Sequence, residues 1–462
     1  MRVLNPRILW QPVELRSDFE APFPLRSAPL EEIHERNPIV EMLRQTGVPL
    51  VEGATTPAEH ALGYLSLAAE VEHALLVQYL YASISITGSQ GATDDPRRKL
   101  LTIAIEEMGH LATVQNLLIL VGGRNSLHLQ RDVLRESSPV NPLPLLLEPV
   151  THTSLAKYVM AERPAEVPSE NLGEIVSRLE PEAEHAVGRS IPRVGAIYAL
   201  LTWIFLPKDQ ADAWLPLSGL IALPPGLSHL KDEDLTALAD IAPYEARRED
   251  WVSSDGQFIL QAPHSCADAV ACIDMIAAQG EGVGNTTRSH FERFIELVIS
   301  QEAGQIIIAT IAIAPTVATI TEEYAHLWGE VFALQYQLVV LSILHSLYTA
   351  RSADGNGLRE GLNGVANAGM RTVLLPVAAL LISLPQRTES SALAGPPFDL
   401  PRELLEFEPG VDLAPRHRAL LARLASIYAS IKVHPTFASR PDDGFTLSDL
   451  ETFDQTRRDL FP

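Results

Sequence analysis

Apolar residues recur at intervals of three and four along two long stretches near the start of the chain, the spacing of one face of an α-helix. The first stretch opens with "TTPAEH", where Thr56 is a good N-cap, the proline suits the first helical position and the glutamate completes a capping box. It is expected to end near Ile86. The second opens at Asp95, which a proline follows, and ends at Gly122 and Gly123. The pattern predicts two long consecutive helices.

Helical periodicity returns later in the chain, without the strand–helix alternation of a parallel sheet. Further helices are predicted over residues 170–206, 266–279, from about Ser289 onward, 322–350, 358–384 and 414–432. Residues 124–170 are rich in proline and are predicted to form a long irregular crossover, and "SSALAGPPFDLP" is predicted to be a loop. The predicted fold class is therefore mainly α.

Two long apolar stretches raise the question of whether the chain crosses a membrane. Ala303–Thr321 carries no formal charge, but Pro315 interrupts it, and its content of isoleucine, threonine and valine favours an extended, buried segment. Val331–Ala350 contains His345 together with glutamine, tyrosine and serine, a polarity that bilayer-spanning helices rarely carry. Both stretches are predicted to lie in the protein core.

Each of the two long helices is predicted to carry ionisable side chains on its apolar face. Glu72 lies among leucines and alanines of the first helix, and Glu107 and His110 lie among isoleucine, valine and leucine on the second. Residues three apart on a helix are neighbours, so Glu107 and His110 can reach one point. Glu106 falls on a different side and is expected to be solvated or hydrogen-bonded to a ligand.

A bound metal ion is one way to compensate such buried carboxylates, whose burial is otherwise costly. A glutamate from one helix and a Glu-x-x-His pair from another form half of a carboxylate-bridged dimetal site in a four-helix bundle. The alternative is a polar core network, in which these groups pair with arginine, lysine or one another. The residues alone leave both interpretations open.

The second half of such a site is expected from "AVACIDMIAAQGEGVGNTTRSHFERF". Glu281 lies at the inner end of one predicted helix and His290 at the start of the next, and the glycines between them allow a tight turn. Taken singly, Glu281 is typical of a surface residue at a helix end and His290 of a capping or core histidine. Together they are candidates for the missing ligands.

Composition narrows the class of protein. Hydrophobic residues make up 46% and charged residues 20% of the 462 residues, as in an ordinary globular protein. The net charge of −23 argues against nucleic-acid partners and against an anionic membrane surface. Cys266 and Cys272 are too few for a disulfide framework. The first residues contain no apolar run of signal-peptide length, so a cytoplasmic protein is expected.

Several sequence blocks occur in a familiar order: "AEVEHALLVQYLYASISI", "IAIEEMGHLATVQNLLILVGG", "IAAQGEGVG", "SHFERF" and "ALAGPPFDLP". Over residues 56–400 the chain resembles the ferritin-like family named after the iminophenyl-pyruvate dimer synthase domain. That domain forms part of the violacein- and rebeccamycin-pathway enzymes, which couple two amino-acid-derived imines oxidatively. The EEMxHL and QGEG blocks are the most specific parts of the resemblance.

The resemblance implies a ferritin-like four-helix bundle with a non-haem metal site that holds one or two iron ions or other first-row metals. Carried over by position, its metal ligands are Glu72, Glu107, His110, Glu281 and His290. Three segments are then expected: an N-terminal arm over residues 1–55, the metal-binding bundle over 56–300, and a C-terminal helical extension packed on the bundle over 301–462.

The chain departs from the family pattern at one position. The family's third helix opens with an I-G-E-F-Y-like block, whereas residues 194–198 read "VGAIY", with Ala196 where the glutamate is expected. Either a nearby carboxylate replaces it, with Glu184 beside His185 as the candidate, or the site holds a single metal or stays open. An open position suits catalysis and equally suits a degenerate site.

The leading functional hypothesis is a metal-dependent oxidase or oxygenase that acts on a small organic substrate with O₂ in secondary metabolism. Tyr79, Tyr81 and Tyr198 are candidate hydrogen-bond donors to ligands or redox relays, and core aromatic packing is the alternative. A second hypothesis is an accessory or binding protein with a degenerate metal site, and a third is iron storage. The hypotheses leave open a homo-oligomer or a pathway enzyme as partner.

Overall fold

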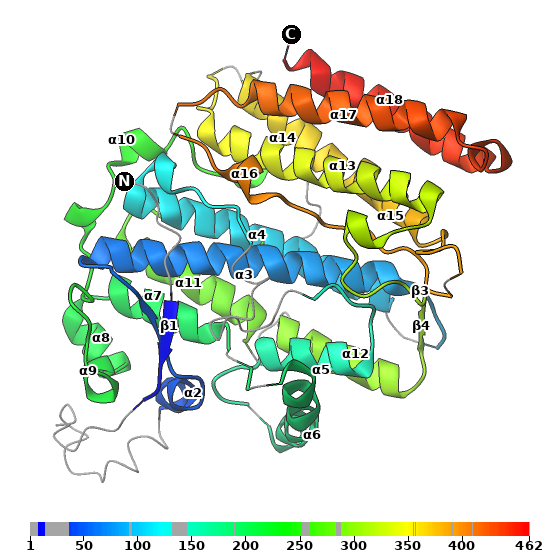
Figure 1. Ribbon diagram of the computed structural model, residues 1–462. Coiled ribbons are helices and arrows are strands. Elements are labelled where there is room, and N and C mark those ends of the chain that lie inside the picture. The colour runs from blue at the N-terminus through cyan, green and yellow to red at the C-terminus, as the bar shows by residue number, and fades with distance from the viewer. Residues whose placement is uncertain are drawn as a thin grey trace.

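The computed structural model describes residues 8–13, 37–91, 95–131, 146–167, 169–188, 190–191, 193–251, 258–282, 288–353, 355, 357–389, 391–408 and 410–461. Helices dominate these residues and lie in stacked rows (Figure 1), which confirms the mainly α prediction. The described residues also form two small antiparallel sheets. In one, β1 (Ile8–Gln11) pairs with β2 (Val48–Val51), and in the other β3 (Ile86–Ser89) pairs with β4 (Ile306–Ile308).

The two predicted long helices are present with the predicted ends. Helix α3 (Pro57–Ser85) begins with the Thr56 capping box, in which the Thr56 hydroxyl accepts from the Glu59 amide and the Glu59 carboxylate accepts from the Thr56 amide. Helix α4 (Pro96–Gly122) begins after Asp95 and ends at Gly123, whose φ of +68° is readily adopted only by glycine. The two helices pack along each other at the centre of the molecule (Figure 1).

Four shorter helices complete the bundle around α3 and α4. At one end α7 (Gly195–Phe205) packs on α3 and on α11 (Cys266–Gly280), and α11 packs on α4, which closes a ring of four helices. At the other end α12 (His290–Glu302) packs on α4 and on α5 (His152–Ala161). Figure 1 shows α7 and α11 toward one end of α3, and α5 and α12 toward the other. The short helices therefore end or begin near the middle of the long ones.

The remaining elements surround this bundle. Short 3₁₀ turns lie at residues 124–126, 232–234, 248–250, 317–319 and 437–439, and residues 369–374 form a π-helical turn. The other helices are α2 (Pro38–Thr46), α6 (Glu170–Val187), α8 (Lys208–Trp214), α9 (Leu217–Leu220), α10 (Leu238–Ile241), α13 (Glu323–Tyr348), α14 (Leu358–Ala368), α15 (Leu375–Leu381), α16 (Arg402–Leu405), α17 (Ala414–Val433) and α18 (Pro441–Asp459).

Several sequence-based boundaries need correction. The predicted crossover over 124–170 contains α5, which Thr151 caps with a capping box to Ser154; residues 132–145 and 168 lie outside the described residues. The single helix predicted over 170–206 is two helices, because Gly188 ends α6 in the left-handed conformation. The N-terminal segment contains β1, α2 and β2, which its weak periodicity did not predict, and residues 1–7 and 14–36 are outside the description.

The prediction of a buried extended segment over Ala303–Thr321 is only partly right. The segment is largely extended and contains β4, but Ile307 and Ile313 are 42% and 63% exposed. Among the described residues, β4 pairs with β3 alone. A sheet of two strands does not cover the side chains on the outer face of β4. The prediction of an extended backbone is therefore largely right, and the prediction of burial holds for Ile306, Ile311 and Ile320 but not for Ile307 and Ile313.

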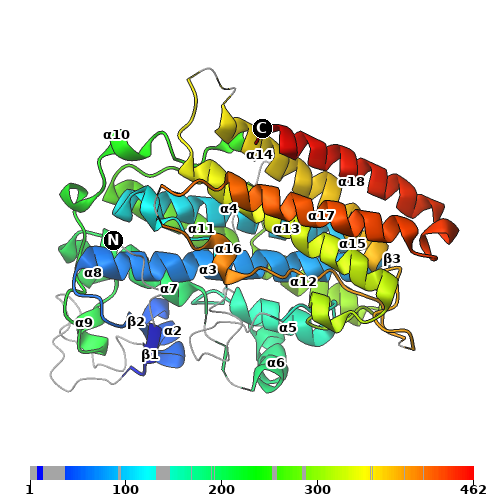
Figure 2. The same ribbon diagram turned by 45° about the horizontal axis from the view of Figure 1, so that its top comes forward.

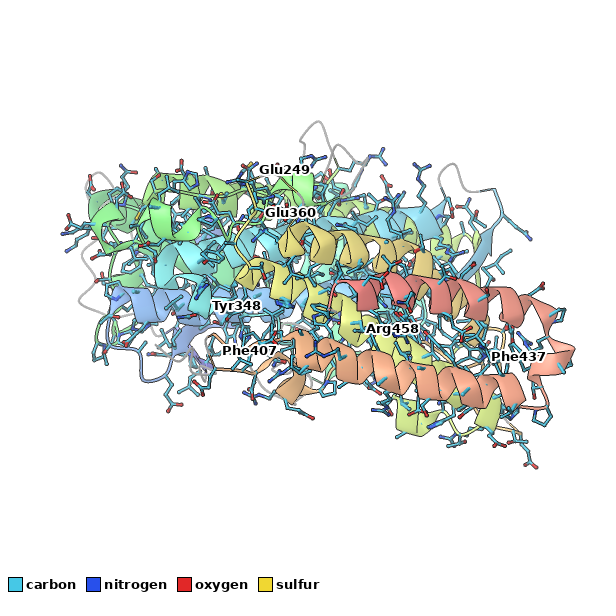
Figure 3. The ribbon with its side chains drawn as sticks, turned by 90° about the horizontal axis from the view of Figure 1, so that it is seen from above. Glu249, Tyr348, Glu360, Phe407, Phe437 and Arg458 are labelled. Atoms are coloured by element: carbon cyan, nitrogen blue, oxygen red, sulfur yellow. The ribbon has the colours of Figure 1, made fainter. Side chains whose placement is uncertain are left out.

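The C-terminal helices lie over one side of α3 and α4. Helix α13 packs on α14 and α17, and Figure 2 shows α17 and α18 running together on the outside. Figure 3 places Phe437 where the chain turns between these two helices and Tyr348 beside Phe407, whose ring lies 5.0 Å away. Helix α18 was not predicted, because it is mostly polar; Asp454 and Arg457 attach it to Gln335 of α13.

Two helical segments are long and apolar enough to cross a membrane by length and composition, α13 and residues 358–381. The relevant window of α13 is 83% buried inside the protein, as in the core helix of a soluble protein, and that of 358–381 is 56% buried. The prediction that residues 331–350 belong to the core is confirmed.

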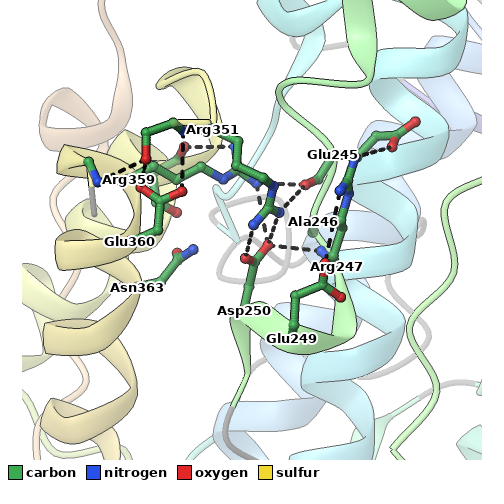
Figure 4. Close-up of polar contacts among 12 residues, drawn as sticks. Glu245, Ala246, Arg247, Glu249, Asp250, Arg351, Arg359, Glu360 and Asn363 are labelled. Atoms are coloured by element: carbon green, nitrogen blue, oxygen red, sulfur yellow. Dashed lines mark hydrogen bonds and ion pairs between the residues drawn. The ribbon is translucent and has the colours of Figure 1, made fainter. Parts of the chain in front are cut away.

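A buried ion network joins the loop before α11 to the C-terminal helices (Figure 4). Arg351 makes two bonds to Asp250, of 2.7 and 2.8 Å. The fully buried guanidinium of Arg359 donates to the backbone oxygens of Ser346 and Glu245. Backbone acceptors and a carboxylate thus bind the terminal nitrogens of the two arginines, so we interpret the network as structural.

Replacing Gly109 with alanine should destabilise the protein, although alanine favours helices by about 1 kcal/mol over glycine. A Cβ at position 109 would lie 2.3 Å from the backbone oxygen of Ile259, so the segment packed there has to move, at a cost of about 1–3 kcal/mol. The control is Gly364→Ala in α14, where nothing lies within 4 Å and a small gain is expected. Urea unfolding of both variants tests this, and equal effects would contradict it.

His417 should make the protein less stable in mild acid. It is buried beside His345 and Arg457, and burial lowers the pKa of His417 from 6.5 to about 3. Below pH 6.5 the unfolded chain binds a proton that the folded protein excludes, so stability falls with pH down to about 3. Between pH 6.5 and 5 the loss is about 2 kcal/mol. Urea unfolding at both pH values should show a smaller loss for His417→Gln; an identical loss would contradict this assignment.

Candidate metal centre

A first group of ligand atoms lies between the midpoints of α3 and α4. Glu72, Glu107 and His110 are all buried, and each offers an atom within 4.8 Å of the others. His110 Nδ1 donates to Glu107 Oε2 at 3.0 Å and lies 3.5 Å from Glu72 Oε2. The structure therefore brings together the three residues that helical periodicity had selected.

A second group lies where α5 ends and α12 begins, and it uses the other oxygen of Glu107. Its members are Glu107, Glu162 and His290, again buried and within 4.8 Å. His290 is the first residue of α12 because Ser289 caps that helix through a capping box with Glu292. His290 Nδ1 lies 2.8 Å from Glu107 Oε1 and 3.9 Å from Glu162 Oε1.

Several atoms of these groups converge. Among the described residues, Glu72 Oε2, Glu107 Oε1 and His290 Nδ1 are buried and make no hydrogen bond of good geometry, although His290 Nδ1 forms an ion pair with Glu107 Oε1 at 2.8 Å. A buried polar atom without a hydrogen bond is costly, and cations bound at the two groups would satisfy these atoms. Carboxylate oxygens with imidazole nitrogens suit first-row transition metals such as iron. The residues present thus fit a site in which Glu107 bridges two metal positions.

Two tyrosines hold the outer carboxylates in place. The Tyr198 hydroxyl of α7 donates to Glu72 Oε1, and the Tyr79 hydroxyl of α3 donates to Glu162 Oε1 at 2.7 Å. Burial and the neighbouring carboxylates raise the pKa of both phenols well above their ordinary value, so both remain donors. The hydroxyl of Tyr81, the third candidate, donates instead to the backbone oxygen of Ala312.

The pKa values describe how the buried groups share charge in the metal-free protein. Burial would raise the pKa of Glu107, but the charges of His290 and His110 hold it well below its ordinary value. Burial would lower the pKa of His110, but hydrogen bonding to Glu107 and Glu72 raises it to about 10. Burial and the charge of Glu107 raise the pKa of Glu72 to about 8. In the metal-free protein, the protonated imidazoles therefore provide the positive charge that a bound metal cation would otherwise provide.

Glu281 is outside both ligand groups found among the described residues. Its carboxylate lies against the start of α7 and accepts from the Gly195 amide; a Cβ at position 195 would lie 2.5 Å from Glu281 Oε1. Burial, with a contribution from the nearby Glu162, raises the pKa of Glu281 to about 8. The side chain is close to the second group, and its role as a ligand stays a prediction.

The proposal that Ala196 faces the site stays a prediction, whereas the structure places the carboxylate expected to replace its glutamate. Residues two apart on a helix point about 200° apart, so Tyr198 and Ala196 lie on different sides of α7. Glu184 and His185 lie near the end of α6, partly or fully exposed, and neither belongs to a ligand group among the described residues. Glu162 is the carboxylate that the structure adds.

Glu162 was missed because it directly follows the last residue of α5, in a stretch predicted to be irregular. Its sequence signal was weak: a lone glutamate after the apolar run "LAKYVMA", before an arginine and a proline. The sequence analysis placed Glu106 as solvated or hydrogen-bonded to a ligand, and the second alternative is correct, because Glu106 Oε2 lies 2.9 Å from His290 Nε2.

Comparison with known proteins agrees with this description of the fold. Residues 65–211 match the family model described as Ferritin-like. The matched segment includes Glu72, Glu107, His110 and Glu162 but ends before His290. A search of the curated proteins and a search of the solved structures each gave no match. The protein is mainly α, its residues 65–211 are similar to the Ferritin-like family, and it contains buried groups of glutamate and histidine that could hold metal.

Proposed function

We propose that this protein is a non-haem, carboxylate-bridged di-iron oxidase or oxygenase of the cytoplasm. The observation that carries the proposal is the position of Glu107, whose two oxygens face the two groups. Each group also has its own glutamate and its own histidine, an arrangement typical of two adjacent metal positions. Bound iron would supply the one-electron chemistry by which O₂ is reduced and an organic substrate is oxidised.

The chain's own residues would provide binding, orientation and exclusion of water. Glu72, Glu162 and Glu107 supply negative charge, and His110 and His290 supply nitrogen ligands. Tyr198 and Tyr79 fix the outer carboxylates by hydrogen bonds. The ligand residues are at most 4% exposed, so the groups lie in a dry environment in which such contacts are strong.

The proposed substrate is a small, amino-acid-derived molecule of secondary metabolism. This part rests on the resemblance to the iminophenyl-pyruvate dimer synthase family, carried by the EEMxHL and QGEG blocks. The accessory-protein alternative rested on the missing glutamate at Ala196. Glu162 weakens that argument, because it gives the second group a carboxylate of its own.

Anaerobic loading with Fe²⁺ followed by exposure to O₂ tests the proposal. We expect about two iron ions per chain, which oxidise on exposure to O₂, and faster O₂ consumption when imines freshly generated from amino acids are added. Protein that binds no iron would contradict the metal centre. Iron uptake far beyond two ions per chain would favour storage, and binding without any substrate-stimulated O₂ consumption would favour an accessory role.

A further inference from the structure

The two histidines of the metal centre each donate a hydrogen bond from Nε2, and the acceptors of these two bonds are of different kinds. His110 Nε2 donates to Gln279 Oε1 of α11 at 2.9 Å. His290 Nε2 donates to Glu106 Oε2 of α4 at the same distance. One imidazole is therefore oriented by a neutral amide and the other by a carboxylate.

The two groups have several features in common. Each group has one outer glutamate that accepts from a tyrosine, and both share Glu107. The two groups differ in the acceptor of the hydrogen bond that the histidine Nε2 donates. Glu106 is fully buried and also accepts from the guanidinium of Arg293, which fixes its carboxylate in place.

A histidine that donates its second N–H to a carboxylate is a more basic metal ligand than one that donates to an amide. We propose that the two positions bind metal with unequal affinity, that the His290 position fills first, and that Glu106 and Gln279 are the positioning residues that set this order. The inference rests on the proposed metal centre and adds to it an order of loading.

A titration with Co²⁺, followed by absorption in the visible region, tests the order. We expect two binding steps whose affinities differ about 10- to 100-fold, the usual effect of such partners. His290→Ala should remove the tight step and leave the weak one, and His110→Ala should do the reverse. Each variant should keep the spectrum of one position. His152→Ala alters a half-exposed histidine between Glu182 and Glu302 and should leave both steps unchanged.

Exchanging the chemistry of the two acceptors, Gln279 and Glu106, tests whether they set the metal affinity of the histidines or only support the fold. Gln279→Glu should tighten the weak step about 10-fold or more, because it gives His110 a carboxylate partner. Glu106→Gln should weaken the tight step by a similar factor. Gln279→Glu leaves the Glu106–Arg293 pair intact, so it remains informative if Glu106→Gln fails to fold.

Three results would overturn the inference while leaving the metal centre in place: two steps of equal affinity, loss of the tight step in His110→Ala, or no change of the weak step in Gln279→Glu. A wild-type protein that binds no Co²⁺ and no Fe²⁺ would overturn the proposed function as well. The failure of the loading order and the failure of the metal centre are thus distinguishable.

Discussion

Replacing Glu107 with glutamine should remove both metal ions at once. The two oxygens of Glu107 face His110 and His290, so one side chain serves both groups. The amide of glutamine is neutral and presents one oxygen where the carboxylate presents two. We expect metal affinity to fall by at least about 100-fold at both positions, near the upper end of what changes around a metal site produce.

The measurement is metal content after loading and removal of excess metal, compared with His110→Ala. The histidine variant should lose one position and keep the other, whereas Glu107→Gln should lose both. Unfolding of the metal-free proteins in urea controls for damage to the fold. Glu107→Gln should cost about 1–3 kcal/mol, because its loss leaves buried imidazoles without their carboxylate. A Glu107→Gln protein that still binds two ions would show that Glu107 does not bridge the positions.

Much of this centre was predictable because two of its helices are long and regular. Helices α3 and α4 run for 29 and 27 residues, and most of their side chains are buried. The apolar period predicted the helices and the burial of Glu72, Glu107 and His110, but it did not predict that Glu106 on another side is buried as well. The start of α12 could be predicted as well, because Ser289 and Glu292 form a local capping signal on either side of His290.

The rest of the centre depends on contacts that no local pattern encodes. Glu162 is brought to Glu107 by the packing of α5 on α12, and its own surroundings in the sequence carry no period. Glu281 was chosen because it lies at the inner end of its predicted helix, but its distance to the ligands depends on how α11 meets α7. Ala196 was judged by alignment to a motif, whereas its direction depends on where α7 begins. Helix ends are the least predictable parts of a helix, and four of them meet here.

Glu162 is the candidate ligand that the sequence analysis missed and the structure adds. Replacing it should therefore test the structure-based assignment against the sequence-based one. Glu162→Gln keeps an acceptor for the Tyr79 hydroxyl but replaces the outer carboxylate of the second group with a neutral amide. We expect metal content to fall from about two ions to about one, because Glu72, Glu107 and His110 remain intact. The remaining ion should then depend on His110 and be lost in the Glu162→Gln/His110→Ala double variant.

The matched control is Glu184→Gln, since Glu184 is the carboxylate that sequence reasoning favoured. It lies near the end of α6, in no ligand group among the described residues, so both ions should stay bound. Metal analysis of the two variants beside wild type decides between the carboxylates. If Glu184→Gln loses an ion and Glu162→Gln keeps both, the second position is built around α6, and the packing of α5 against α12 does not place a ligand. If neither variant loses an ion, Glu281 becomes the candidate for the outer carboxylate of the second position, and Glu281→Gln should then lower the metal content.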